Sequence, residues 1–131
     1  MKFIKTFAIL AILFAANTLT AQAVASKWPA MKSFEEVITR INNGVEQNNL
    51  GVISSFTGTL QSFSQRLTTE EIPTAYKNNQ KLQAAITKMQ GQTNKLNELV
   101  IAKAPEASLK TAYLETYATF EQVRKHLKET K

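Results

Sequence analysis

The sequence predicts an all-α protein with the architecture of an antiparallel up-down-up-down four-helix bundle. Apolar residues recur at spacings of three and four in four separate segments, which is the period of amphipathic helices. The residues that break helices are few, because the chain of 131 residues has only 4 glycines and 3 prolines. Four helices joined by three short connections favour the up-and-down topology.

The first 23 residues have the organisation of a secretory signal peptide. Two lysines precede an uncharged apolar run, and Ala21-Gln22-Ala23 has the small-x-small form of a signal-peptidase site. The apolar run is about ten residues long, whereas a membrane span needs about twenty, so we expect no permanent membrane anchor. The expected parts are therefore a signal peptide at 1–23 and a four-helix bundle at 24–131, exported to the periplasm.

Composition limits what the exported part does. The chain has no cysteine, so its stability must come from packing or from a bound ligand. It has 16 basic and 10 acidic residues, and the net charge of +6 falls to +4 without Lys2 and Lys5. This modest excess is spread along the helices. It does not favour nucleic-acid binding, but it allows contact with acidic envelope polymers or lipid headgroups.

The first two helices follow from one apolar stripe each. Pro29 suits the first position of the first helix, where a backbone N–H would have no partner. Asparagine and glycine offer two places to end this helix, and we expect the later one, at 48–51, because Val45 continues the stripe. The two stripes are Met31, Phe34, Ile38, Ile41 and Val45, and Ile53, Phe56, Leu60, Phe63 and Leu67.

The third and fourth helices repeat the pattern. Pro73 falls near the start of the third helix, and Pro105 suits the first position of the fourth. Gly91 lies inside the third helix, where glycine costs about 1 kcal/mol relative to alanine, so we expect a kink or a close contact there. The stripes are Leu82, Ile86, Met89, Thr93, Leu96 and Val100, and Leu109, Tyr113, Thr116, Phe120, Val123 and Leu127.

Met31 and His126 are the candidate cofactor ligands. In an up-down-up-down bundle the first and fourth helices run antiparallel, so both residues are expected at one end of the bundle. A thioether and an imidazole can hold a haem iron from its two axial sides. With MKSFEEVITRI around the methionine, this pair resembles the cytochrome b562 family in position and spacing. The resemblance implies noncovalent haem b, electron transfer and a periplasmic redox partner.

The sequence also departs from that family. The third helix has no phenylalanine to lie beside a haem, so Met89 and Ile86 would have to replace it. Gln122 stands where the family has a basic residue near a propionate, which leaves Arg124 or Lys125 for that role. No Cys-x-x-Cys-His motif is present, so covalent haem attachment is excluded.

The candidate ligands also have a purely structural interpretation. A methionine on an apolar stripe, such as Met31, is often a filler of the core. His126 lies among basic residues near the end of the fourth helix, where the helix dipole favours a cation. Trp28 is expected to cover the open end of the bundle.

An internal repeat gives a second resemblance. SFEEVITR at 33–40 echoes TFEQVRKH at 119–126, which suggests duplicated helical hairpins. The chain also resembles uncharacterised exported bacterial helical proteins that begin Trp-Pro-x-x-Lys-x-Phe-His and carry a Phe-His pair in the last helix. Glu35 and Glu121 replace those histidines, so a metal site there would be lost or altered; the alternative is that both are solvated charges. Four residues match the opening pattern: Trp28, Pro29, Lys32 and Phe34.

Enzymatic chemistry has little support, because the chain has one histidine and no aspartate. These residues do not supply a serine triad, a dimetal carboxylate site or a structural zinc site. Two classes of function remain. One is a haem b protein with Met31 and His126 as axial ligands, and the other is a cofactor-free bundle that binds an envelope protein or surface. We expect a monomer in either case.

Overall fold

The computed structural model describes residues 28–69 and 72–129, and it is all-helical over these residues. The signal peptide predicted at 1–23 lies outside the described residues. Within the described ranges, none of the helices combines the length and the apolar character that a membrane span requires. The helices are α2 (Pro29–Glu46), α3 (Gly51–Thr69), α4 (Thr74–Lys77), α5 (Gln80–Ile101) and α6 (Glu106–Glu129).

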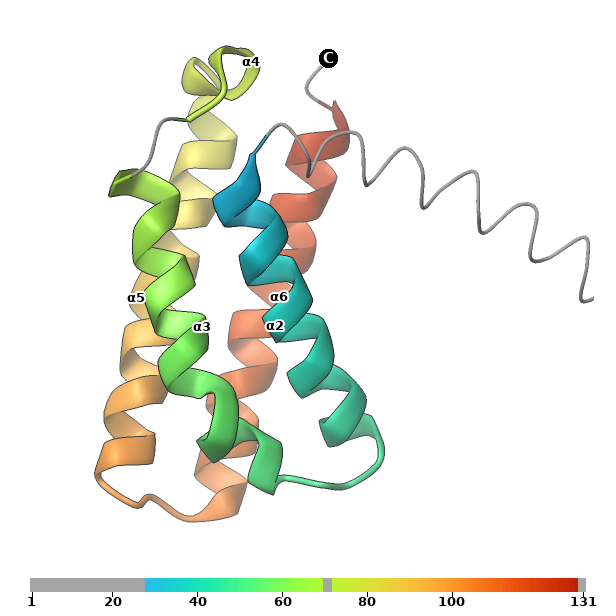
Figure 1. The fold of residues 1–131 in the computed structure, drawn as a ribbon, viewed down its shortest axis with the longest axis vertical. Coiled ribbons are helices and arrows are strands. Elements are labelled where there is room, and N and C mark those ends of the chain that lie inside the picture. The colour runs from blue at the N-terminus through green and yellow to red at the C-terminus, as the bar shows by residue number, and fades with distance from the viewer. Residues whose placement is uncertain (1–27, 70–71, 130–131) are drawn as a thin grey trace, which may run out of the picture.

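The four long helices lie side by side along the longest axis of the molecule, and successive ones are joined at alternate ends (Figure 1). Each packs mainly on its neighbours in sequence: α2 on α3, α3 on α5, and α5 on α6. Helix α2 also contacts α6, and the short α4 contacts α5. The predicted all-α class is confirmed for the described residues.

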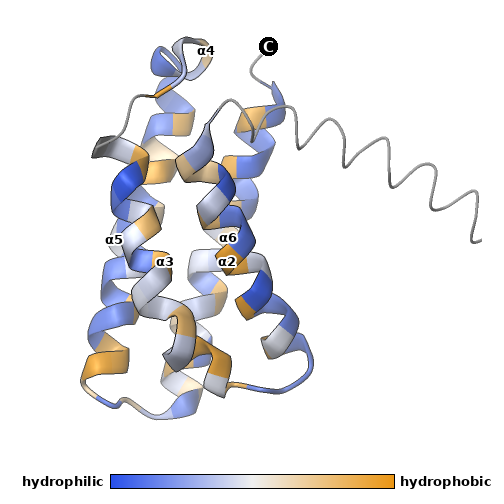
Figure 2. Cartoon of the chain, in the orientation of Figure 1, coloured by the Kyte–Doolittle hydropathy of each residue, from blue (hydrophilic) through white to orange (hydrophobic). Residues whose placement is uncertain are grey.

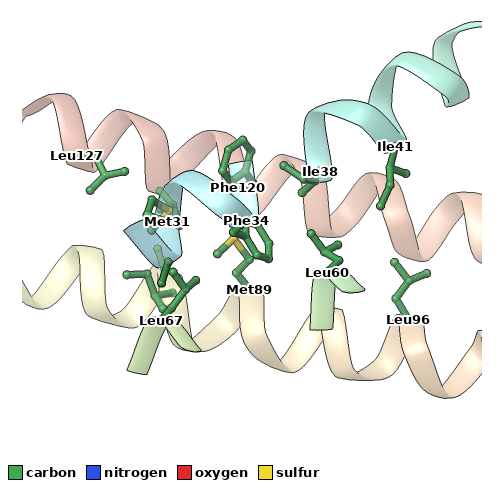
Figure 3. Packing of buried hydrophobic residues seen from close by; sticks show 14 of the residues in the cluster. Met31, Phe34, Ile38, Ile41, Leu60, Leu67, Met89, Leu96, Phe120 and Leu127 are labelled. Carbon is green, nitrogen blue, oxygen red and sulfur yellow. The ribbon is translucent and has the colours of Figure 1, made fainter. Parts of the chain in front are cut away.

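The apolar stripes meet in one hydrophobic core between the long helices (Figure 3). All residues of the first and fourth predicted stripes are buried. Each buried leucine, isoleucine or phenylalanine contributes about 1.5–3 kcal/mol through removal of its side chain from water. Successive layers of this core contain Met31, Leu67 and Leu127, then Phe34, Met89 and Phe120, then Ile38 and Leu60, and then Ile41 and Leu96.

The second stripe differs from its prediction. Thr57 and Ser64 are fully buried, whereas Phe56 and Phe63 are only partly buried at the edge of the core. The side of α3 that faces the core is therefore rotated from the predicted one, and Phe56 lies toward α2. Phe63 follows Phe56 by seven residues, so it lies on the same side of α3. There the guanidinium of Arg40, from α2, lies over the ring of Phe56 at 5.8 Å from its centroid.

Gly44 sets how closely α2 approaches α3. A Cβ added at Gly44 would lie 2.6 Å and 2.7 Å from the two Cγ atoms of Val52. These distances are too short for a real contact, so any residue other than glycine at this position would force the helices or Val52 to move. Helix α2 continues past Gly44, as predicted, and ends at Glu46. The backbone then changes direction at Asn48, which has a φ of 61°. Asparagine tolerates this left-handed conformation better than most residues.

The starts of α5 and α6 differ from the predicted ones. Pro73 precedes α4 rather than the third long helix, and α5 begins after Asn79, whose side chain accepts a hydrogen bond of 3.0 Å from the N–H of Leu82. Pro105 lies one residue before the start of α6. A kink or a close contact was expected at Gly91. An added Cβ there would meet nothing within 4 Å, so the close contact is absent.

Substitution of Gly44 tests the close approach of α2 and α3. We expect Gly44→Ala to lower the free energy of unfolding by about 1–2 kcal/mol, since overpacking against Val52 exceeds the gain in helix propensity. The measurement is urea unfolding followed by far-UV circular dichroism. Gly91→Ala is the matched control, and we expect it to raise stability by about 0.5–1 kcal/mol. Equal effects of the two substitutions would contradict this account of Gly44.

Candidate functional site

Met31 and His126, the predicted ligand pair, lie in different surroundings. The side chain of Met31 is 1% exposed and shares its core layer with Leu67 and Leu127 (Figure 3). The side chain of His126 is 22% exposed, and its Nδ1 lies 3.6 Å from Oε2 of Glu129. His126 is thus at the border of the core rather than inside it.

The direction of His126 follows from the contacts of Arg124. Nε of Arg124 lies 3.8 Å from Oε1 of Glu35 in α2, so Arg124 marks the side of α6 that faces α2. Successive residues of an α-helix are rotated by about 100° around its axis. His126, two residues later, therefore projects about 200° from Arg124, away from α2 and Met31. The structure does not bring the two predicted ligands together.

The residues at this end do not fit a haem as they lie. Met31 is enclosed by apolar side chains. Trp28 and Tyr76 are 1% and 4% exposed, and their rings stack with centroids 5.6 Å apart. Arg124, a candidate partner for a propionate, is instead paired with Glu35. The described residues contain no group of three or more His, Cys, Asp or Glu that could hold a metal ion, but a haem held by one methionine and one histidine would need no such group. Haem ligation by Met31 and His126 stays a prediction.

Glu35 and Glu121, the predicted altered site, are brought together by Arg124. Oε1 of Glu121 lies 3.6 Å from Nη1 of Arg124, and Oε1 of Glu35 lies 3.8 Å from Nε of Arg124. The three side chains are 29% to 47% exposed, so these ion pairs contribute at most about 1 kcal/mol. Both glutamates are therefore ion-pair partners in the seam between α2 and α6, and a cation bound there would compete with the guanidinium.

The two segments of the internal repeat face each other across this seam. Phe34 and Phe120 occupy equivalent positions of the repeat, and their ring centroids are 5.7 Å apart. Tyr117 lies 6.1 Å from Phe120, and the guanidinium of Arg124 lies over the same ring at 5.8 Å. The role of Arg124 was missed from the sequence. Alignment of the two repeat segments pairs Arg124 with the buried Ile38, so a charged residue replaces an apolar one at a position that faces the core.

Tyr113 adds a buried polar contact to the same seam. Its hydroxyl lies 3.3 Å from the carbonyl oxygen of Ile38 and 3.1 Å from Oδ1 of Asn42, and the side chain is 0% exposed. Burial raises the pKa of Tyr113 well above its usual value near 10.0, and Tyr117 and Glu46 act in the same direction. The sequence predicted Tyr113 only as a core residue, because the stripe does not reveal a partner for its hydroxyl.

The described part of the chain is thus an all-helical protein with an apolar core and a polar, aromatic seam between its first and last long helices. Comparison of the chain with protein-family models, with curated proteins and with solved structures finds no match. The resemblances drawn from the sequence therefore rest on their own residues.

Substitution of Tyr113 tests this seam through the pH dependence of stability. Tyrosine ionises near pH 10 in the unfolded chain but not when buried, so unfolding becomes easier as the pH rises above about 10. We expect Tyr113→Phe to cost about 1 kcal/mol at pH 7 through the lost hydrogen bond, and this deficit to shrink by about 1 kcal/mol at pH 11.

The measurement is urea unfolding of both proteins between pH 7 and about pH 11. Tyr117→Phe is the control, because Tyr117 is only partly buried and we expect a smaller change with pH. A deficit of Tyr113→Phe that does not vary with pH would contradict the role assigned to its burial.

Proposed function

We propose that the chain is an exported up-down-up-down four-helix bundle that acts in the periplasm by binding an anionic envelope surface, without a cofactor and without catalysis. Support comes first from the interior. The buried polar residues of the described part are all hydroxyl side chains, namely Thr57, Ser64, Thr93, Thr116 and Thr119. Catalytic sites usually place ionisable groups with shifted pKa values in a cleft. Here the resolved pKa shifts are those of tyrosines that pack against the core.

The observation that carries the proposal is a row of three lysines on α5. Lys81, Lys88 and Lys95 are spaced by seven residues and are all exposed. None of them makes an ion pair with another described residue. Seven residues of helix span about 10.5 Å, so the row extends for about 21 Å along one edge of the molecule. Such a row can contact several anionic lipid headgroups at once, each lysine contributing about 1 kcal/mol near the surface.

Vesicle binding tests the lysine row. We expect the protein to sediment with vesicles of mixed anionic and zwitterionic phospholipid, and the triple change of Lys81, Lys88 and Lys95 to Gln to weaken binding at least tenfold. The control changes Lys32, Lys103 and Lys125 to Gln, three exposed lysines that give the same change in net charge. Equal loss in both triple variants would show attraction by net charge alone and would contradict a role for the row.

Haem b binding by Met31 and His126, with electron transfer to a periplasmic redox partner, is the competing proposal. One observation favours it: Met31 lies in the same core layer as Leu127, the neighbour of His126 in α6 (Figure 3). A position of both side chains near one end of the molecule is what axial ligation of one haem would require. Ligation would still require His126 to turn toward α2 and the buried Met31 to leave its apolar neighbours.

Titration with haemin separates the two proposals. We expect broad, unsaturating visible spectra in the oxidised and dithionite-reduced states, because the candidate ligands face different surroundings. Sharp α and β bands that saturate at one haem per chain, and that are lost in both Met31→Ala and His126→Gln, would instead establish axial ligation. Circular dichroism of each variant shows whether a loss of bands reflects the ligand or the fold.

A further inference from the structure

Trp28 carries a buried hydrogen-bond donor that is not used within the described part of the chain. Its side chain is 1% exposed, and its Nε1 has no hydrogen-bond partner among the described residues. The N–H lies in the plane of the indole, and the ring of Tyr76 stacks on that plane at an interplanar angle of 23°, so the N–H does not point at this ring. A buried donor without a partner costs more than a typical hydrogen bond contributes, so buried tryptophans usually have one.

The surroundings of this donor are aliphatic. Trp28 directly precedes α2, so it lies at the end of the molecule where α2 begins. The core layer at this end contains Met31, Leu67 and Leu127, which offer no oxygen or nitrogen acceptor (Figure 3). A buried water needs several polar partners, which these side chains do not supply. A partner that suits the indole here is therefore a largely apolar molecule with one acceptor, and the flexible side chain of Met31 can adapt to it.

Helix α4 lies at the same end, and its position depends mainly on Tyr76. The helix connects α3 to α5 at the end of the molecule where α2 begins (Figure 1). Tyr76 is its buried residue, whereas its other three residues are exposed, and much of α4 is pale or blue in Figure 2. Nε2 of Gln83 donates a hydrogen bond of 3.2 Å to the carbonyl oxygen of Tyr76, which joins α4 to α5. Because so short a helix has little stability of its own, the ring of Tyr76 can leave Trp28 while the long helices stay packed.

We propose that this end of the molecule binds a single-chain lipid, which is one aliphatic chain that ends in an oxygen acceptor. The ring of Tyr76 moves aside, the chain packs against Met31, Leu67 and Leu127, and the oxygen accepts a hydrogen bond from Nε1 of Trp28. An aliphatic chain matches the side chains of this layer. It is also narrower than an aromatic ring, so it requires a smaller displacement of the core.

The unpaired donor favours the bound state over the closed one. In the closed state the indole N–H is removed from water without gaining a partner, so a ligand that supplies an acceptor recovers that loss. A ligand shifts a conformational equilibrium only by its preference for one of the two states. Here the preference comes from this hydrogen bond and from burial of the chain. The site uses no lysine of the row on α5, so it does not depend on the proposed function.

Fluorescence tests the site directly, because Trp28 is the only tryptophan of the chain. We expect titration with decanoate, below the concentration at which it forms micelles, to shift the emission and to saturate at one ligand per chain. Decanol carries the same chain with an uncharged oxygen. Tighter binding of decanoate would identify an ionised head group, and equal binding would show that any oxygen acceptor serves. Emission that does not change, or does not saturate, with either ligand would overturn the proposal.

Trp28→Phe tests the donor, because it keeps a ring for the stack and removes the N–H. We expect calorimetry to show that this variant binds decanoate at least about fivefold more weakly than the wild type. Tyr117→Phe, which removes a hydroxyl elsewhere, is the matched control and should bind like the wild type. The triple glutamine variant of the lysine row should also bind like the wild type. Unchanged affinity of Trp28→Phe, or lost affinity of the triple variant, would overturn the proposal.

Tyr76→Ala tests the movement of α4. We expect decanoate to associate with this variant at least about threefold faster than with the wild type in stopped-flow fluorescence, because no ring has to leave Trp28 first. Circular dichroism shows whether the long helices of each variant remain folded. An association rate equal to that of the wild type would contradict the role assigned to Tyr76.

Discussion

The contact between α2 and α6 brings together the first and the last of the described helices. These two helices are not consecutive in the chain, so only their side-chain contacts hold them together. Of its interactions, the buried hydrogen bonding of Tyr113 and the pairing of Phe34 with Phe120 contribute about 1 kcal/mol each beyond the burial of area. The ion pairs of Arg124 are partly exposed and contribute less. Aromatic packing and one hydroxyl, rather than charge, therefore hold this seam.

The fold class was predictable because the spacing of apolar residues within one segment indicates a helix, whichever helix it packs against. Every residue of the first and fourth stripes is buried as expected. The second stripe was harder, since spacings of three and four fit Phe56 and Phe63 as well as they fit the buried Thr57 and Ser64. Hydrophobicity favoured the phenylalanines, but the side of α3 that faces the core depends on how α3 packs against its neighbouring helices, which the spacing of its own residues does not reveal.

The candidate site was less predictable than the fold, because a site depends on the direction of side chains across two helices. The sequence predicted that Met31 and His126 lie toward the same end of the molecule. That prediction depends only on the order and direction of the helices. Their relative direction depends on the rotation of α6, which becomes visible through the pairing of Arg124 with Glu35. That pair also joins Glu35 to Glu121, which the internal repeat related in sequence but not in space.

Helix α5 separates two kinds of surface with one seven-residue period. Lysines at 81, 88 and 95 and amides at 83, 90 and 97 follow the same period, two residues out of phase. A straight α-helix drifts by only about 20° per seven residues, so each row keeps its side over the length of α5. The three lysines thereby lie away from α3, whereas Gln90 and Asn97 donate hydrogen bonds to it. One row of this period therefore serves the contact between α3 and α5, and the other row is left exposed to solvent.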